Sequence, residues 1–565
     1  MFHCRNLVLT IILTLLAGET LGFWYWPFTV NNAVHEPILE TTEPEYDEYA
    51  NSSVKRIAII GAGAAGSSSA YHLQKYASES DVAINVTVIE RSSYIGGRST
   101  TVNAYGNVLE PVELGASIFV EVNTILKNAS RAFGLSTKSS RSDVEDIMGI
   151  WNGEEFVYTQ ADSDWKYWDI VKLFWKYGLA PYKTQKLMKT VVGSFLKLYE
   201  RPFFPFRSLS DRVEELGLQA VTSVTGEQYL TANGISPSFA TDIIQASTRV
   251  NYGQNLNFIH GLETMVCMAI EGAMQIQGGN WQIFDSMVKD SNSTVLLNHT
   301  VTEITKSNDR YRIKTTTKDA TGLSRTHDEP FDTIILAAPL QYTDIKLPSD
   351  LLTHTPDTIP YVTLHVTLFT SPHALNPEFF GLPAGSSSMP NTILTTLPPN
   401  TVPTDFEKPV GPAGFFSIST LRKVINPETL EWEYLYKIFS PSALTSEFLS
   451  GILGVTVPED LSTISSAANN TITWYYPHVW NSYPYELPRV TFEEIELAQG
   501  FYYTSGIESF ISTMETSALM GKNVARLVVD DYLAAMEPKE EGMSADQIVE
   551  APTPEAVPVP QVDEL

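Results

Sequence analysis

The sequence contains only two cysteines and few basic side chains. Cys4 and Cys267 are too few for a disulfide framework or for a zinc site built from thiolates. There are 37 lysines and arginines against 65 aspartates and glutamates, so the formal net charge is −28. Such an acidic chain is predicted not to bind nucleic acid, and an anionic membrane surface would repel it as a whole.

Hydrolytic motifs and a membrane-spanning run are missing as well. No His-Glu-x-x-His pair and no Gly-x-Ser-x-Gly turn occurs, so neither zinc nor serine hydrolysis is indicated and no metal site is predicted. The apolar run over residues 7–18 follows Arg5 and is too short to span a bilayer as a helix. We therefore predict a signal peptide over residues 1–22 rather than an uncleaved anchor, and no transmembrane segment in the mature chain.

The two ends of the mature chain are predicted to be solvated. Residues 23–53 form an acidic linker, and residues 536–565 form a disordered tail rich in proline and glutamate. The terminal sequence 562–565 (VDEL) resembles an ER-retrieval signal, with a chance acidic ending as the alternative. Glycosylation is expected at Asn51, Asn128, Asn292, Asn298 and Asn469. We expect a protein of the secretory lumen, retained in the ER or secreted.

The remaining chain is rich enough in apolar residues for more than one core, with 43% hydrophobic and 18% charged residues. Its strongest motif begins with a continuous apolar strand at 57–60, followed by Gly61-Ala-Gly-Ala-Ala-Gly66 and a predicted helix over 67–76. Gly61 permits the tight turn, Gly63 lets the backbone approach a pyrophosphate, and Gly66 allows helix and strand to pack closely. The pattern predicts a dinucleotide site.

A second apolar strand at 86–89 ends in Glu90, the carboxylate expected to bind the adenosine ribose hydroxyls. Glu90 also disfavours NADP, because it would repel a 2′-phosphate. The continuation 90–98 (ERSSYIGGR) resembles flavoproteins related to amine oxidases and glutathione reductase, although a bare turn is the alternative for its glycine pair. Arg98 could neutralise the diphosphate bidentately. The predicted cofactor is therefore FAD.

Further segments fit this flavoprotein pattern. Strands are expected at 294–297, 301–306, 311–316 and 331–340, and residues 113–117 resemble the flavin-side segment of the group. A late helix over 513–533 is predicted to point its N-terminus at the flavin pyrimidine. The predicted cofactor-binding residues are Gly61, Ala62, Gly63, Ala65, Gly66, Glu90, Arg91, Gly97, Arg98, Gly115, Ala116, Val301, Met514 and Glu515.

With these motifs in place, the chain resembles the prenylcysteine oxidase (prenylcysteine lyase) family. The more specific matches are 249–254 (RVNYGQ), 506–508 (GIE) and 512–518 (STMETSA), within a resemblance that spans about 54–535. The charged segment 299–330 does not align, and the terminal VDEL departs from the lysosomal animal members, which make a lysosome or vacuole a further possible destination. The resemblance implies a thioether oxidase that uses FAD, O2 and water to convert farnesylcysteine or geranylgeranylcysteine into cysteine, a prenyl aldehyde and hydrogen peroxide during the degradation of prenylated proteins.

No side chain is required as a general base, because sulfur and flavin bear the developing charges when hydride leaves the allylic carbon. The catalytic residues are therefore left open. Arg249, Tyr252 and His478 are candidates to bind the cysteine carboxylate or order water, with a structural role as the alternative. Trp168 and Trp175 share a helical face that forms either core or the wall of an apolar substrate pocket.

The expected fold is α/β, with an FAD-binding Rossmann-type domain of the glutathione reductase/amine oxidase kind interleaved with an α+β substrate domain. The FAD domain is assigned to 54–120, 249–345 and 490–535, and the prenylcysteine domain to 121–248 and 346–489. Two other functions stay open. One is another luminal FAD oxidase acting on amines or isoprenoids, and the other is a non-catalytic prenyl-binding protein like the Rab GDP-dissociation inhibitors.

Overall fold

The computed structural model describes residues 54–139, 147–160, 166–307, 309–318, 323–386, 389–399, 401, 409–461 and 471–536. The predicted signal peptide, acidic linker and nearly all of the predicted tail lie outside these residues, as do Asn51 and Asn469. Asn128, Asn292 and Asn298 are all exposed. Among the described helices, none has both the length and the apolar character needed to cross a bilayer.

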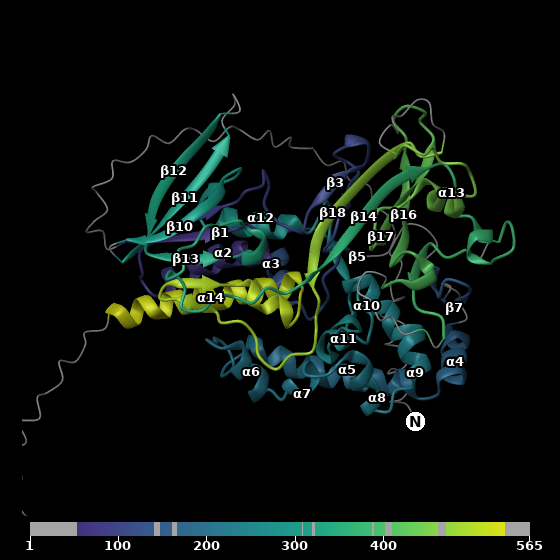
Figure 1. The fold of residues 1–565 in the computed structure, drawn as a ribbon, viewed down its shortest axis with the longest axis horizontal. Helices are drawn as coiled ribbons and strands as arrows, with labels where there is room; N and C mark the ends of the chain where they lie inside the picture. Colours follow the sequence, from purple (N-terminus) through teal and green to yellow (C-terminus); the bar gives the residue numbers. More distant parts are fainter. Residues whose placement is uncertain are drawn as a thin grey trace, which may run out of the picture.

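A six-stranded, mostly parallel sheet forms the nucleotide-binding half of the molecule (Figure 1). In spatial order its strands are β19 (Glu496–Ala498), β20 (Phe501–Tyr503), β13 (Thr333–Leu336), β1 (Lys55–Ile60), β2 (Ile84–Ile89) and β9 (Thr294–Leu296). Residues 57–60 of β1 are buried, as expected for a central strand covered on both faces. The predicted Rossmann-type fold is confirmed.

Three helices pack on this sheet or on one another beside it: α2 (Ala64–Glu79), α12 (Trp281–Asp290) and α14 (Met514–Met536). The contact of α2 with α14 is close because small residues line it. A Cβ added at Gly521 would lie 2.2 Å from the carbonyl oxygen of Ala65, and the hydroxyl of Ser68 donates to the carbonyl of Ala518 at 2.6 Å. The predicted late helix is thus tied to the phosphate-binding helix.

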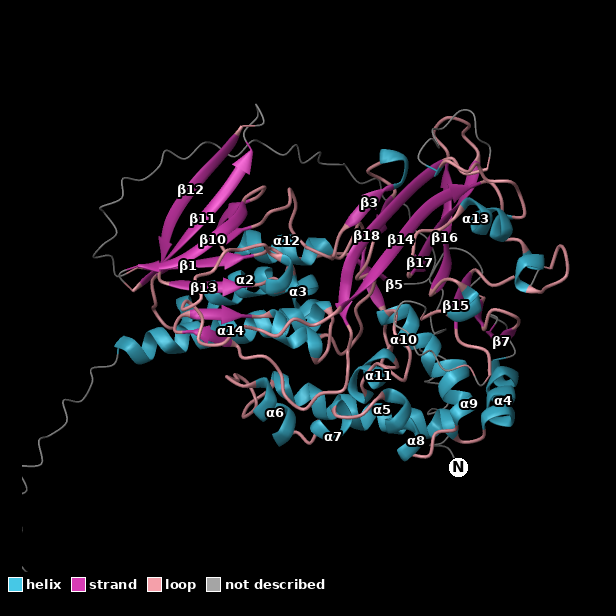
Figure 2. Ribbon diagram, viewed as in Figure 1, coloured by secondary structure: helices cyan, strands magenta, loops and turns pink. Residues whose placement is uncertain are grey.

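An antiparallel three-stranded sheet covers the other side of the nucleotide-binding sheet (Figure 2). It consists of β10 (Thr300–Ser307), β11 (Arg310–Lys318) and β12 (Ser324–Phe331). The charged segment 299–330, which does not align with the family, therefore contains β10, β11 and nearly all of β12, and β12 is the strand that was not expected from the sequence. The expected long buried strand at 331–340 is shorter in the structure, because β13 ends at Leu336 and a turn of 3-10 helix follows at Leu340–Tyr342.

The second half of the molecule is built on a seven-stranded sheet (Figure 2). In spatial order its strands are β18 (Trp474–Pro484), β14 (Tyr361–Ser371), β17 (Trp432–Ser440), β16 (Ser417–Ile425), β15 (Thr392–Thr395), β6 (Met148–Trp151) and β7 (Phe156–Gln160). All pairs are antiparallel except β15 with β6. The remaining small strands are β3 (Thr101–Asn103), β4 (Pro111–Glu113), β5 (Thr137–Ser139) and β8 (Met274–Ile276).

A layer of helices lies below this sheet in Figure 1. Its members are α4 (Lys166–Tyr177), α5 (Ala180–Phe195), α6 (Leu209–Glu215), α7 (Gln219–Thr222), α8 (Gly226–Ala232), α9 (Pro237–Phe239), α10 (Gln245–Tyr252) and α11 (Gly261–Cys267). A π-helical turn, Ala240–Ile244, joins α9 to α10. The domain boundary predicted at 249 falls inside α10, so the helical layer extends beyond it. Elsewhere, α13 (Ser446–Leu453) lies beside the seven-stranded sheet (Figure 1).

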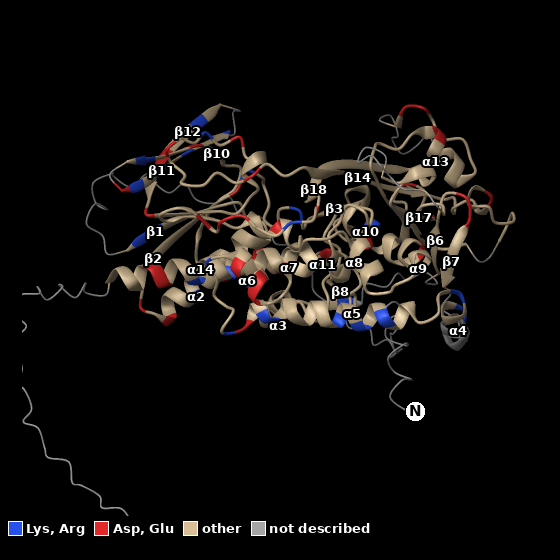
Figure 3. Ribbon diagram, turned by 60° about the horizontal axis from the view of Figure 1, so that its bottom comes forward, with Lys and Arg blue, Asp and Glu red and all other residues tan. Residues whose placement is uncertain are grey.

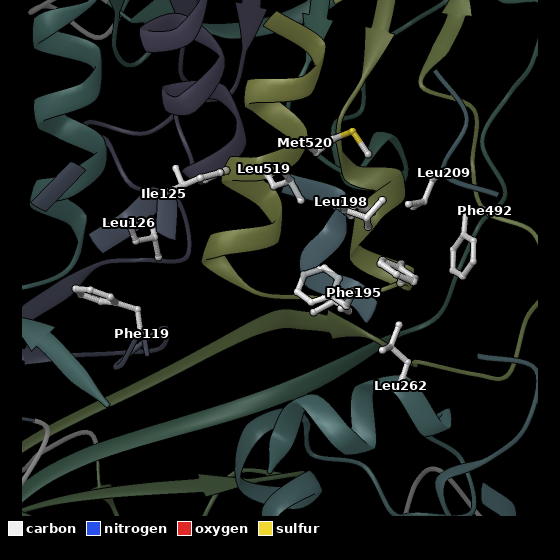
Figure 4. Packing of buried hydrophobic residues seen from close by; sticks show 14 of the residues in the cluster. Phe119, Ile125, Leu126, Phe195, Leu198, Leu209, Leu262, Phe492, Leu519 and Met520 are labelled. Carbon is white, nitrogen blue, oxygen red and sulfur yellow. The ribbon is translucent and has the colours of Figure 1, made fainter. Parts of the chain in front are cut away.

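The largest apolar core joins the two halves. Figure 4 shows Leu519 of α14 between Ile125 of α3 (Thr124–Ala132) and Leu198 of the 3-10 helix Leu196–Tyr199 that follows α5, with Met520 of α14 near Leu198. All four side chains are buried in one continuous cluster. The cofactor half and the helical layer therefore share a core, which fixes their positions relative to each other.

Candidate active site

The described residues surround a cavity of about 1690 Å³. It starts at the carboxyl ends of β1 and β2 and continues between the seven-stranded sheet and the helical layer. Pockets for a single small molecule usually measure about 300–1,000 Å³. The cavity therefore has room for an extended dinucleotide and a second ligand beside it.

At the nucleotide end of the cavity, the glycines Gly61, Gly63 and Gly66 leave the backbone without side chains; we call this turn the cradle. Gly61 has φ +104°, and a Cβ there would lie 2.8 Å from the carbonyl oxygen of Ala337. A Cβ at Gly66 would lie 1.9 Å from the carbonyl oxygen of Gly61, so only glycine lets α2 approach β1 this closely. Gly63 precedes α2 and no side chain caps this helix end. The N–H groups of its first turn are thus left for phosphate oxygens.

Glu90 is fixed at the rim of this cradle. Its Oε2 accepts the N–H of Ala62 and its Oε1 accepts the N–H of Ser92, each at 2.8 Å. A carboxylate offers about four acceptor positions, so two remain for a ribose diol. The side chain lines the cavity where the motif predicts the ribose site.

Eleven of the predicted cofactor residues line the cavity: Gly61, Gly63, Ala65, Glu90, Arg91, Gly97, Arg98, Gly115, Ala116, Val301 and Met514. Ala62 and Gly66 do not line the cavity. The N–H of Ala62 donates to Glu90, and the missing side chain of Gly66 allows the close contact of α2 with β1. These residues come from α2, β10, α14 and the loops between elements, including the turn that follows β1. Together they fit FAD, with the diphosphate at α2 and the flavin toward residues 115–117.

The structure corrects the role predicted for Arg98. Its Nη1 donates to the carbonyl of Ser482 at 2.6 Å, and its Nη2 donates to Glu508 at 2.7 Å in an ion pair. These bonds direct the guanidinium toward β18 and the 3-10 helix Ser505–Ser509. Arg98 therefore joins three segments of the cavity wall and is not free to clamp the diphosphate in the predicted bidentate manner.

The prediction for Glu515 also needs correction. The residue does not line the cavity, and its carboxylate accepts the N–H groups of Ile125 at 2.9 Å and Leu126 at 3.0 Å. Glu515 thus caps the first turn of α3, whose own N-cap residue supplies no side-chain bond. Met514, one residue earlier, does face the cavity.

Of the predicted substrate residues, Tyr252 alone lines the cavity among those whose side chains are described. Its ring meets that of Tyr483 edge-on at 5.2 Å, and Tyr483 lines the cavity too. Burial and the neighbouring Glu263 raise the pKa of Tyr252 well above its usual value. This tyrosine is therefore a neutral hydroxyl in the wall.

Arg249 has the structural role that the sequence left open as the alternative to substrate binding. It is 1% exposed and does not reach the cavity. Its Nε donates to Asn255 Oδ1 and its Nη2 to the carbonyl of Pro409, both at 2.7 Å. The guanidinium N–H groups that a substrate carboxylate would need are therefore already bonded within the protein.

The aromatic candidates are also displaced from the cavity. His478 packs edge-on against Trp480 at 4.6 Å, and Trp480 rather than His478 lines the cavity. Trp175 is 90% exposed, so it forms neither core nor pocket wall. Trp168 lies in α4, but its side chain lies outside the described part of the chain.

Sequence reasoning missed a buried cation in the substrate half, Lys437 on β17. Its Nζ donates to the carbonyl of Glu113 at 2.7 Å and to Ser117 Oγ at 3.0 Å, so it lies beside the predicted flavin-side segment. Burial lowers the pKa of Lys437 to about 8, and Glu113 opposes that shift. Glu113 faces the same cavity, and burial raises its pKa to about 7. A lysine within an apolar strand carries no sequence signal for this placement.

The register of the seven-stranded sheet divides the cavity floor into two rows. One row is mostly polar and consists of Gln160, Met148, Thr392, Ser419 and Lys437. The next row is mostly apolar and consists of Tyr158, Ile150, Leu394, Ser417 and Phe439. All ten side chains line the cavity. The floor can therefore hold a ligand with one polar and one apolar part.

A buried acidic cluster lies behind Tyr252. Burial raises the pKa of Glu263 to about 8 and that of Glu486 well above its usual value. His260 Nε2 lies 3.5 Å from Glu486 Oε2, and burial lowers the pKa of this histidine to about 3. None of the three lines the cavity, so the cluster supports the wall without meeting the ligand.

Comparison with known proteins agrees with this geometry. A family model described as prenylcysteine lyase matches residues 160–541, and one for an NAD(P)-binding Rossmann-like domain matches residues 59–133. Farnesylcysteine lyase of Arabidopsis thaliana is 28% identical, over 88% of this chain and 92% of that protein. Prenylcysteine oxidase 1 of Bos taurus is also 28% identical, over 84% and 88%.

Solved structures of similar fold include a putrescine oxidase double mutant, with TM-score 0.52, 13% identity and coverage of 84% of this chain and 99% of that chain. A fatty acid isomerase from P. acnes gives TM-score 0.52 and 13% identity, covering 84% and 98%. At such identities the likeness establishes the fold alone. The cavity, the cradle that fits FAD and the family match over most of the chain agree, and this protein belongs to the prenylcysteine lyase family.

Proposed function

We propose that this FAD-dependent oxidoreductase cleaves the thioether of prenylcysteines, using O2 and water and releasing cysteine, a prenyl aldehyde and hydrogen peroxide. The observation that carries the proposal is the single cavity that joins the dinucleotide cradle to the two-row floor. Bound FAD would accept the hydride from the allylic carbon next to sulfur. Water supplies the aldehyde oxygen, the thiol leaves as cysteine, and O2 takes the two electrons.

The chain's own residues contribute binding and orientation. The polar row, with Lys437 and Ser419, fits the charged amino acid part of the substrate. The apolar row and the facing side chains Leu173, Met188 and Phe239 fit a prenyl chain. Holding both ends fixes the allylic carbon between them, which is the main contribution a protein can make when the cofactor performs the redox step.

The test combines a visible spectrum of the purified protein with a peroxide assay on farnesylcysteine. We expect a flavin spectrum and equal amounts of peroxide and farnesal. S-dodecylcysteine is the matched control substrate, because its saturated chain lacks the allylic activation and should not be oxidised. Turnover of putrescine without turnover of farnesylcysteine would favour an amine oxidase, and loss of both would exclude oxidase activity of either kind.

We propose in addition that the protein acts in the lumen of the secretory pathway. The predicted signal peptide and the exposure of Asn128, Asn292 and Asn298 support this location. A mobility shift of the expressed protein on treatment with a glycosidase would test it. An unshifted protein confined to the cytosol would contradict it.

A further inference from the structure

The corner between α4 and α5 exposes two large apolar side chains. Trp175 is 90% exposed and Leu179 is 63% exposed. Neither belongs to a buried cluster of the described residues. Such exposure of a tryptophan next to a leucine requires an explanation, because burial of either would stabilise a folded chain.

The same two helices are strongly basic in an otherwise acidic chain. Residues 166–199 contain seven lysines and one acidic residue, Asp169, a local balance of +6 against −28 for the whole chain. The exposed lysines are Lys172, Lys176, Lys183, Lys186, Lys189 and Lys197. Figure 3 shows the blue segments of α5 and α4 along one edge of the molecule. The charges are therefore gathered on one side.

Few carboxylates oppose these lysines. Lys176 Nζ lies 3.1 Å from Asp242 Oδ2, and Lys183 Nζ donates to the carbonyl of Gly234 at 3.2 Å. Within the described part of the chain, no ion pair joins Lys186 or Lys189 to an acidic side chain. Spacings of three residues place Lys183, Lys186 and Lys189 on one stripe of α5.

The opposite faces of the two helices line the cavity. Leu173 of α4 and Thr184, Gln185 and Met188 of α5 belong to its wall. A helix with side chains is about 10–12 Å thick. A molecule held against the outer face of α4 and α5 is therefore separated from the cavity by a single layer of helix.

We propose that the outer face of α4 and α5, comprising Trp175, Leu179, Lys183, Lys186 and Lys189, is a docking surface for an anionic lipid bilayer. Tryptophan and leucine flanked by exposed lysines match the pattern of surfaces that lie in the bilayer interface. The apolar pair favours a bilayer over an acidic polymer. A further argument rests on the proposed function, since a prenyl chain partitions into lipid and docking brings the cavity within reach of it.

The overall charge of −28 does not prevent this contact. At physiological ionic strength the Debye length is about 8 Å, so charges farther away are largely screened. The lysines of α5 lie closest to the membrane and dominate the interaction there. The repulsion expected from composition alone therefore applies to other faces of the molecule.

The test measures binding of the purified full-length mature protein to vesicles without substrate. Phosphatidylcholine vesicles are compared with an equimolar mixture of phosphatidylcholine and phosphatidylserine, at low and physiological salt. We expect binding to the mixture that weakens with salt. The variant K183Q/K186Q/K189Q should lose about 100-fold in partition coefficient, roughly fivefold for each lysine. The matched control K75Q/K318Q/K346Q removes three exposed lysines elsewhere and should bind like the wild type.

A second variant, W175A/L179S, should weaken binding about tenfold through the loss of apolar burial. If it binds like the wild type while the lysine variant does not, the vesicle contact is electrostatic alone, Trp175 and Leu179 do not enter the bilayer interface, and the proposed surface is overturned. Equal binding by the lysine variant and its control, or no binding to the mixed vesicles, overturns it as well. Oxidation of dissolved farnesylcysteine is assayed separately, so failure of docking and failure of the proposed function are distinguishable.

Discussion

At the scale of single residues, the cavity depends on buried polar groups that face a ligand. Lys437 donates two hydrogen bonds to Glu113 and Ser117 and has a third N–H for the cavity. Its position in the polar row places that donor beside the flavin-side segment. A positive charge there suits the carboxylate of an amino acid substrate.

We expect the variant K437M to lower kcat/KM for farnesylcysteine about 10- to 100-fold, as for loss of a charged hydrogen bond. The methyl ester of the substrate should be affected only slightly, because it lacks the carboxylate. Since the pKa of Lys437 is lowered to about 8, wild-type activity on the free acid should decline as pH rises through that value, and K437M should lack this limb. The exposed Lys423 provides the control K423M. Equal losses on acid and ester would assign Lys437 a structural role.

At the scale of secondary structure, the helices are fixed by contacts between distant segments. Glu515 of α14 caps α3, and Gly66 of α2 allows the approach to β1. The cap fills two backbone donors that α3 cannot satisfy by itself. The N-terminus of α14 therefore contributes to two features: Met514 lines the cavity, and Glu515 caps the neighbouring helix α3.

We expect the variant E515A to lower the free energy of unfolding by about 2–4 kcal/mol, because two buried N–H groups lose their partner. Glu227 lies in the first turn of α8, is exposed, and gives the control E227A, which should change stability by less than about 0.5 kcal/mol. Thermal and denaturant unfolding of both variants measure the difference. Similar small effects in the two would show that the cap is dispensable.

At the scale of the whole molecule, buried acidic side chains determine how the free energy of unfolding responds to pH. Burial raises the pKa of Glu263 to about 8 and that of Glu515 to about 7, far above an unfolded glutamate. Between pH 6.5 and 8 the folded chain therefore holds protons that the unfolded chain has lost. The free energy of unfolding should then fall as pH rises through this window. Buried His72 and His260, whose pKa values are lowered to about 4 and 3, act in the opposite sense and mainly below this window, because an unfolded imidazole titrates at about pH 6.5.

We expect the midpoint of thermal unfolding to be lower at pH 8 than at pH 6.5 by about 2–4 °C. The variant E263Q keeps the size of the side chain and removes its ionisation, so it should shrink the gap by raising the midpoint at pH 8. The exposed Glu214 provides the control E214Q, which should leave the gap unchanged. A gap of the same size in E263Q would show that this buried carboxyl does not titrate in the window.

Short stretches of sequence were sufficient to predict the parts of the site that are formed by the backbone. The strand, glycine turn and helix at 55–79 appear as predicted because a buried apolar run and three glycines leave few other conformations. Glu90 likewise occupies the predicted rim, since it directly follows a strand of the same sheet. The residues that form the FAD cradle could therefore be predicted from sequence patterns a few residues long.

The substrate half shows the limit of such inference. The stripe that contains Trp175 has the period of a core helix, yet this side chain is exposed, because period alone does not tell which face meets a partner. Arg249 and His478 have suitable chemistry and face away from the cavity.

The nucleotide-binding motif and the FAD assignment could be predicted from the amino acid sequence because they depend on residues close together in the chain, and the family resemblance could be predicted because each of its motifs is a short continuous run. Only the folded chain shows that Lys437 meets Ser117, that Glu515 caps α3 and that Trp175 is left exposed on α4. The two contacts join residues 320 and 390 positions apart, and the exposure of Trp175 depends on which helix face is left uncovered. Only the packing of the whole chain sets either one.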